Sequence, residues 1–453
     1  MKYFVISCCF LTCLNSSAAE PLALSKDYWK EKEFLSSFNG SYRINARIEP
    51  SVTGEERELL VEIQPIMAKG EREKALEILK VNELAKSSAA IAFNIGNICF
   101  ELGQLDSAEQ FYIQALDKFP NFRRAHRNLG FVYVRQGDWE KALPSFEESI
   151  RLGDHDGATF GQLAYGRMQM GQYASALQAF QLAQLTQPET IDWKAGTAQC
   201  LDQLKRSEEA LSLLDEVIKA RPEEPSYYLL QASAYLAINR SDDAITNLEL
   251  IRRLGKLDAD NHLLLANLHL RAGSAALARP VMMKALGMDD KPEYAAVVNL
   301  LEFVTSTRDW KLARDYMKLA KQSYPKSNDV LLTQKINYLT AFVDIESGDQ
   351  EERGANVLEG IIKQNPLNAQ ALILLARYRA KMQRYQESTM MLEQASRVKG
   401  HEYNAHLELA KVCVSTRRYA TAIRHLDKAL KIRSSDELLS YREAINNLLK
   451  ASN

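Results

Sequence analysis

Glycine and proline are scarce in this chain of 453 residues, which holds 20 Gly and 12 Pro. No segment is of low complexity either. These two absences exclude a largely disordered chain and favour an ordered, mainly helical one.

Charge of one sign is also missing, because 57 Lys and Arg residues face 58 Asp and Glu residues, for a net charge of −1. This balance excludes a general attraction to nucleic acid or to an anionic membrane. After the first twenty residues, no run approaches the roughly 20 apolar residues that a membrane-spanning helix needs.

Those first twenty residues, "MKYFVISCCFLTCLNSSAAE", have the pattern of a secretory signal. Lys2 precedes an apolar stretch, and small residues end it. Such a segment is too short for a membrane span. We expect a signal peptide at residues 1–19, cleaved after Ala19. The alternative, a lipoprotein attached through Cys13, is disfavoured by the neighbouring Phe10 and Thr12.

Cysteine is scarce once that signal is removed, because only Cys99, Cys200 and Cys413 remain. Three thiols far apart in the sequence are not a disulfide framework, and no CxxC motif offers a metal or redox site. We expect three buried, unreactive thiols.

A 34-residue period runs through the chain. If Ala89 is position 1, small residues recur at positions 8, 20 and 27, a large residue at 24, Gly or a polar residue at 15 and often Pro at 32. Position 17, which was not used to set the register, holds Leu105, Trp139, Tyr173, Trp310, Tyr385 and Tyr419. Small residues let two antiparallel helices approach, the large one fills the gap, and positions 15 and 32 end the helices.

The pattern resembles the tetratricopeptide repeat, a helix–turn–helix unit of 34 residues. The resemblance implies an all-α fold, a right-handed α-solenoid of about eleven units. These units cover residues 56–434 and start near 56, 89, 123, 157, 191, 225, 259, 294, 328, 369 and 403. An N-terminal arm, residues 20–55, precedes them, and a capping helix, residues 435–453, follows. The unit at 328 is longer than the others, so we expect a longer helix there.

Sequence signatures of catalysis are lacking. The chain has no GxxxxGK[ST], HExxH or GxSxG motif. His126, His262 and His406 share position 4, a packing position, and His155 falls in a turn between units. We therefore expect no catalytic residue, no cofactor, no metal and no enzymatic activity.

Tetratricopeptide proteins bind partners on a concave surface lined by positions 2, 5, 9, 12 and 13 of each first helix, and stacked repeats usually bind there. Carried over by position, the resemblance implies a peptide-binding groove lined by Phe93, Asn97, Phe100, Arg124, Arg127, Phe131, Arg135, Tyr165 and Met168. The arginines suit a peptide with carboxylates or aromatic side chains. The alternative is that they only form a solvent-exposed helix face. A weaker basic stretch is Arg377, Lys381 and Lys411.

The N-terminal arm carries too many aromatic residues for a solvated tail, namely Tyr28, Trp29, Phe34, Phe38 and Tyr42. We expect this arm to fold back and cover the exposed edge of the first unit, residues 56–88. The alternative is that the arm is a docking element for a partner.

The segment "SKDYWKEKEFLSSFNGSYRINARIEPSVTGEERELL", followed by the first repeats, resembles a group of secreted bacterial tetratricopeptide proteins. These are regarded as components of TonB energy-transduction systems. The resemblance implies a periplasmic, non-catalytic interaction scaffold accessory to TonB/ExbB/ExbD-type uptake. Its partners would be TonB-system components or outer-membrane receptors, without nucleic acid or a membrane span. The alternative is an adaptor in outer-membrane biogenesis or polysaccharide export. The oligomeric state stays open.

Overall fold

The computed structural model describes residues 28–31, 34–35, 38, 47–324 and 330–452. The expected signal peptide and most of the N-terminal arm lie outside these residues. The chain divides into two compact units, residues 1–254 and 255–453. The repeat spacing gives no sign of this division, because the step from 225 to 259 keeps the 34-residue period.

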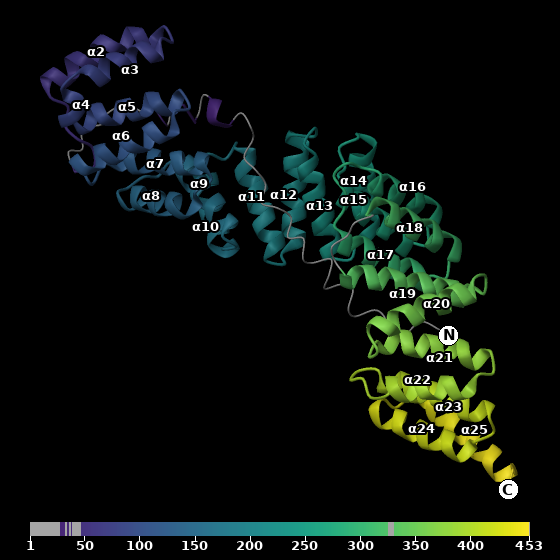
Figure 1. Cartoon of the computed structure of the whole chain (residues 1–453). Coiled ribbons are helices and arrows are strands. Elements are labelled where there is room, and N and C mark those ends of the chain that lie inside the picture. The colour runs from purple at the N-terminus through teal and green to yellow at the C-terminus, as the bar shows by residue number, and fades with distance from the viewer. Residues whose placement is uncertain (1–27, 32–33, 36–37, 39–46, 325–329, 453) are drawn as a thin grey trace. The chain divides into compact units, whose positions relative to one another are not determined.

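The described residues of the first unit form a short 3-10 helix and thirteen α-helices, and Figure 1 labels these α-helices from α2 to α14. Its elements are η1 (Tyr28–Lys30), α2 (Gly54–Ala68), α3 (Arg72–Val81), α4 (Leu84–Ser87), α5 (Ala89–Glu101), α6 (Leu105–Lys118), α7 (Arg123–Gln136), α8 (Trp139–Arg151), α9 (Gly157–Gln169), α10 (Tyr173–Thr186), α11 (Ile191–Gln203), α12 (Ser207–Ala220), α13 (Pro225–Ala237) and α14 (Ser241–Arg253).

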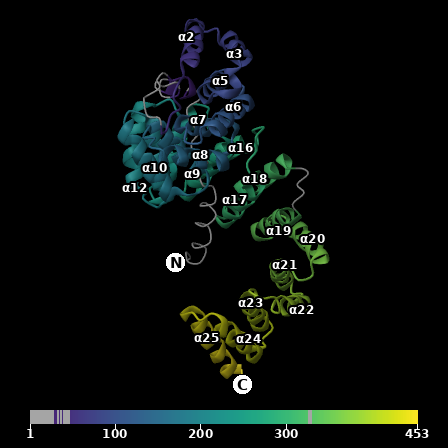
Figure 2. The same ribbon diagram turned by 90° about the vertical axis from the view of Figure 1, so that its left-hand side faces the viewer.

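The described residues of the second unit form five further pairs and a last helix, and Figure 2 labels the helices from α16 to α25. Its elements are α15 (Ala259–Arg271), α16 (Ala275–Leu286), α17 (Tyr294–Ser306), α18 (Trp310–Ser323), α19 (Val330–Ser347), α20 (Glu351–Gln364), α21 (Ala369–Lys381), α22 (Tyr385–Ala395), α23 (Glu402–Ser415), α24 (Tyr419–Ile432) and α25 (Asp436–Ser452). No strand occurs in either set of described residues, and the expected all-α solenoid fold is confirmed.

Two pairs, α5 with α6 and α7 with α8, show the contact that the period predicts between positions 8 and 24. A Cβ atom on Gly130 would lie 2.6 Å from Cε1 of Phe146, and one on Gly96 would lie 2.7 Å from Cε1 of Tyr112. Both aromatic side chains are fully buried. Glycine at position 8 therefore lets the ring of the second helix lie directly on the backbone of the first.

Position 15 ends the first helix of a pair in the left-handed region, as predicted. Gly137 has φ 80° and caps α7. Five units place a longer side chain at the same position with nearly the same angle, for example Arg417 with φ 59°. Because non-glycine residues adopt this region only at a cost, the turn geometry is imposed by the packing of the pair.

The longer unit is accommodated as expected, because α19 has 18 residues whereas the first helices on either side of it have 13. The three thiols Cys99, Cys200 and Cys413 are free and buried, so their expected burial is confirmed.

Candidate functional site

The described aromatic residues of the N-terminal arm lie on first helices of the first unit. We call Tyr28, Trp29, Phe34 and Phe38 the arm rings. Phe38 stacks on Phe100 of α5, with ring centroids 4.6 Å apart. Phe34 meets Phe131 of α7 edge to face at 5.3 Å.

The remaining arm rings, Trp29 and Tyr28, extend this cluster from α5 and α7 to α11. Trp29 contacts both Phe100 and Phe131, at 6.3 and 6.2 Å. Tyr28 reaches Trp193 of α11 at 5.8 Å. Phe34 and Tyr28 are each 3% exposed and Phe38 is fully buried. We call this surface of α5, α7, α9 and α11 the arm groove.

The arm groove contains the site predicted from the sequence, but it is not an open surface. Eight of the nine predicted residues are buried, with Arg135 exposed. The buried ones are Phe93, Asn97, Phe100, Arg124, Arg127, Phe131, Tyr165 and Met168. Phe100 and Phe131 contact the arm rings directly.

Arg124 fixes the arm to the start of α7. Its Nε donates to Oε2 of Glu49 at 3.0 Å, and the two side chains are 7% and 3% exposed. The guanidinium also lies over the rings of Phe93 and Phe122, at 5.1 and 5.9 Å from their centroids. Nearby, the carbonyl of Ile48 accepts from the backbone N–H of Arg123 at 3.1 Å.

Two other predicted residues stabilise the stack of repeats. Arg127 Nη1 donates to Oδ2 of Asp156, at the N-cap of α9, over 3.4 Å. Asn97 Oδ1 accepts from the Tyr112 hydroxyl at 2.7 Å and from Nδ2 of Asn128 at 2.9 Å. These buried contacts join α5, α6, α7 and α9.

The interpretation of the arginines as an exposed helix face is therefore wrong for Arg124 and Arg127, because both are buried in ion pairs. The interpretation as an exposed helix face is partly correct for Arg135. This side chain is exposed, yet its Nη1 donates to the carbonyl of Phe100 at 3.0 Å, and its guanidinium lies 4.7 Å from the Phe100 ring centroid.

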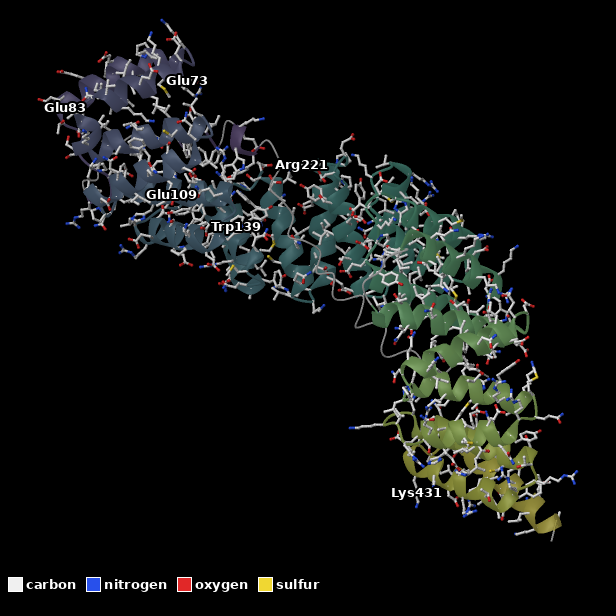
Figure 3. All side chains as sticks on the ribbon, in the orientation of Figure 1. Glu73, Glu83, Glu109, Trp139, Arg221 and Lys431 are labelled. Atoms are coloured by element: carbon white, nitrogen blue, oxygen red, sulfur yellow. The ribbon has the colours of Figure 1, made fainter. Side chains whose placement is uncertain are left out.

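The floor of the arm groove near α11 is polar. Asp192 Oδ1 accepts from Nη1 of Arg221 at 2.9 Å, and Arg221 is labelled in Figure 3. The Tyr165 hydroxyl donates to the backbone carbonyl of Asp192 at 3.3 Å. Burial raises the pKa of Asp192, and Arg221 only partly offsets this effect. Gln162 is fully buried beside the Tyr28 hydroxyl.

Sequence reasoning missed Glu49, Gln162, Asp192 and Trp193 as members of this site. Asp192 occupies position 2 of its unit and could have been found by extending the groove rule one repeat further. Nothing in the repeat pattern indicates Glu49, which precedes the repeats, or Gln162, which lies at position 6.

The ring contacts of the described arm rings are with α5, α7 and α11. Buried aromatic rings on these helices offer the arm rings stacking and edge-to-face partners. Residues 56–88 hold no aromatic side chain, so the expected cover over that edge stays a prediction.

The weaker basic stretch of the second unit is neutralised by carboxylates. Arg377 pairs with Glu346 at 2.9 Å, Lys381 pairs with Glu351, and Lys411 pairs with Glu408 at 2.7 Å. This stretch is therefore a weak candidate for binding an acidic peptide.

The described part of the chain holds no cluster of three or more His, Cys, Asp or Glu side chains suited to a metal ion. Its helices include none with both the length and the apolar content needed to cross a bilayer.

Family models match the chain over more than half of its length. The matches are to tetratricopeptide repeats at residues 167–234, 123–156, 229–295 and 373–437, and to a TPR repeat at residues 96–137. The chain is a tetratricopeptide-repeat protein. The matched residues include Phe100, Phe131 and Trp193 of the arm groove.

Similar proteins share the repeats at low identity. Superkiller protein 3 of Schizosaccharomyces pombe is 26% identical over 125 residues, which are 27% of this chain and 9% of that protein. The crystal structure of YrrB, a TPR protein with an unusual peptide-binding site, is 24% identical and covers 39% of this chain and 89% of that one, with a TM-score of 0.35. A tetratricopeptide protein from Parabacteroides merdae is 19% identical and covers 58% and 98%, with a TM-score of 0.37.

Proposed function

We propose that this tetratricopeptide protein is a non-catalytic periplasmic scaffold that binds a peptide segment of a partner in the arm groove. The observation that carries the proposal is that the groove already holds a peptide segment. Its rings at Phe100 and Phe131 receive aromatic side chains from outside the repeats. A surface that accommodates one aromatic segment has the chemistry to accommodate another.

We further propose that the scaffold is an accessory component of a TonB/ExbB/ExbD-type energised uptake system. Two features of the sequence support this. The first twenty residues have the pattern of a secretory signal. The segment from Ser25 to Leu60 and the repeats after it resemble secreted tetratricopeptide proteins of such systems.

The location is tested by fractionating the native bacterium and sequencing the N-terminus of the recovered protein. Recovery from the periplasmic fraction with Glu20 as the first residue supports the proposal. Recovery from the cytoplasm with Met1 retained contradicts it. A lipid-modified N-terminal Cys13 contradicts the cleavage site and leaves the compartment unchanged.

The partner is tested by chemical cross-linking in intact cells, followed by affinity recovery and mass spectrometry. TonB, ExbB, ExbD or an outer-membrane receptor should be recovered with the wild-type chain and lost with Phe131→Ala. Lys431→Ala, an exposed change in the second unit, should recover them normally. Recovery of outer-membrane assembly or polysaccharide-export proteins instead would favour the adaptor alternative.

A further inference from the structure

We propose that the arm rings, Tyr28, Trp29, Phe34 and Phe38, are a displaceable internal occupant of the arm groove, and that an aromatic-rich segment of a partner protein replaces them there. The inference rests on the proposed function, because it states how the same groove receives its partner. Three observations support it, namely the polar mismatch beneath Tyr28, the type of contact that the arm rings make, and the attachment of the arm at Glu49.

The polar mismatch lies where Tyr28 meets α9 and α11. Among the described residues, the Tyr28 hydroxyl, both polar atoms of the Gln162 amide and Oδ2 of Asp192 make no hydrogen bond of standard geometry, although Gln162 lies close enough to the Tyr28 hydroxyl to lower its pKa against the larger effect of burial. The three residues are 3%, 0% and 3% exposed, so the surroundings do not offer bulk water instead. Buried polar groups in a permanent core are almost always paired, and leaving them unpaired is costly. The arm is therefore an imperfect match for the floor of its groove.

The unpaired atoms also define what a better ligand would carry. Asp192 Oδ2 is able to accept a hydrogen bond from a ligand, and the Gln162 amide is able both to donate one and to accept one. A peptide with a side-chain amide beside its aromatic residues would satisfy both groups. The preferred partner segment thus has three or four aromatic side chains in place of the arm rings and an Asn or Gln next to them.

The arm rings are held by contacts between side-chain rings, which a different sequence can reproduce. Phe38 on Phe100, Phe34 on Phe131 and Tyr28 on Trp193 span three first helices. Ring contacts of this kind tolerate several geometries. Another aromatic segment could therefore use the same surfaces without changing the helices.

Release of the arm rings does not require release of the attachment at Ile48 and Glu49. Glu49 stays paired with Arg124, and Ile48 stays bonded to the backbone of Arg123. This attachment keeps the arm rings close to the groove, at a high effective concentration. A partner must therefore bind strongly enough to compete with the tethered arm, which makes the arm a filter against weak ligands.

The first test measures hydrogen exchange of the full mature chain. We expect the amides of the four arm rings to exchange at least tenfold faster than those of α7 and α9, because the arm rings leave the groove by local opening. Gln162→Leu removes two unpaired polar atoms at similar volume, so it should slow exchange at the arm rings several-fold and leave α13 unchanged. Exchange at the arm rings in step with α7 and α9 in both proteins would overturn the proposal.

The second test uses a fluorescent synthetic peptide of residues 25–50 as the competing segment. The variant Trp29→Ala/Phe34→Ala/Phe38→Ala should bind this peptide at least tenfold more tightly than the wild-type chain, because its own arm no longer competes. A peptide carrying the same three alanines is the matched control and should not bind. Adding Phe131→Ala to the variant should abolish binding.

Two outcomes of the second test would contradict the proposal. A helical triple variant that does not bind the peptide shows that the groove takes no such ligand. A triple variant that loses its helical circular dichroism shows that the arm belongs to the permanent core. Both tests use purified chain and peptide, so they are independent of whether the partner belongs to a TonB system.

Discussion

Arg124 and Glu49, which are 75 residues apart in the sequence, form a buried ion pair between the N-terminal arm and the first turn of α7, with Nε and Oε2 3.0 Å apart. The guanidinium is also held over Phe93. A charge in such surroundings depends on its partner, since an unpaired buried charge is far more costly than a paired one.

Removing one member of this pair should therefore destabilise the first repeats. We expect Glu49→Ala to lower the free energy of local unfolding of α7 by about 3–5 kcal/mol, the usual cost of stranding a buried charge. Hydrogen exchange of the α7 amides measures it. The double variant Glu49→Leu/Arg124→Met should recover most of the loss. Arg206→Ala, which breaks an exposed pair with Glu209, is the control and should leave α7 exchange unchanged.

A second prediction concerns the glycine at position 8. Gly130→Ala would place a Cβ atom 2.6 Å from the ring of Phe146, so we expect a loss of roughly 1–3 kcal/mol from overpacking. Gly360→Ala is the matched control, because its Cβ atom would meet nothing within 4 Å on α20. That change should instead stabilise its helix by about 0.5–1 kcal/mol. Chemical denaturation of both variants tests the contrast, and equal effects would contradict it.

The periodic contact at position 8 and the ion pair of Glu49 with Arg124 differ in how well the sequence could predict them. The contact of Gly130 with Phe146 belongs to a pattern of small and large residues with a 34-residue period, and that period reveals the helix pairs and their turns. The arm follows no period, and nothing in its sequence links Trp29 to Phe100 or Glu49 to Arg124. Its aromatic content predicted burial correctly, but the surface that buries it depends on non-local packing.

The groove residues show the same limit. Positional transfer found Phe100 and Phe131, because groove-facing positions are fixed by helix geometry. It could not show that these rings are covered. Nor could it show that Arg124 pairs with a residue outside the repeats, since that pairing depends on where the arm lies.

A third prediction concerns the thiols. Burial raises the pKa of Cys99 and Cys413, and raises that of Cys200 to about 12. Because the thiolate is the reactive form, the native protein should react with Ellman's reagent at pH 8 only as fast as it locally unfolds. In denaturant, a chain cleaved after Ala19 should give three equivalents of thiol, from Cys99, Cys200 and Cys413. Six equivalents would show that the first nineteen residues are retained, and fast labelling of the native protein would contradict the burial.

The last prediction concerns acid stability of the final repeat, where His406 of α23 and His425 of α24 place their Nδ1 atoms 3.4 Å apart. Burial, His406, Lys428, Arg424 and Arg418 lower the pKa of His425 to about 4. Burial and Lys428 also lower the pKa of His406, against an opposing effect of Glu402. As the pH falls below 6.5, His425 therefore binds a proton in the unfolded chain. In the folded chain His425 stays neutral until about pH 4. The stability of this repeat should fall across that window.

His425→Gln removes the titrating group and should flatten the fall. Hydrogen exchange of α23 and α24, corrected for intrinsic rates at pH 7.5, 6 and 5, measures the difference between variant and wild type. His155→Gln, at an exposed histidine of the first unit, is the control and should keep the wild-type dependence in α23 and α24. A wild-type repeat that is equally stable at pH 7.5 and pH 5 would show that His425 accepts its proton in the folded state. The close approach of the two rings would then be compatible with a shared proton, and burial would not be the dominant effect at this site.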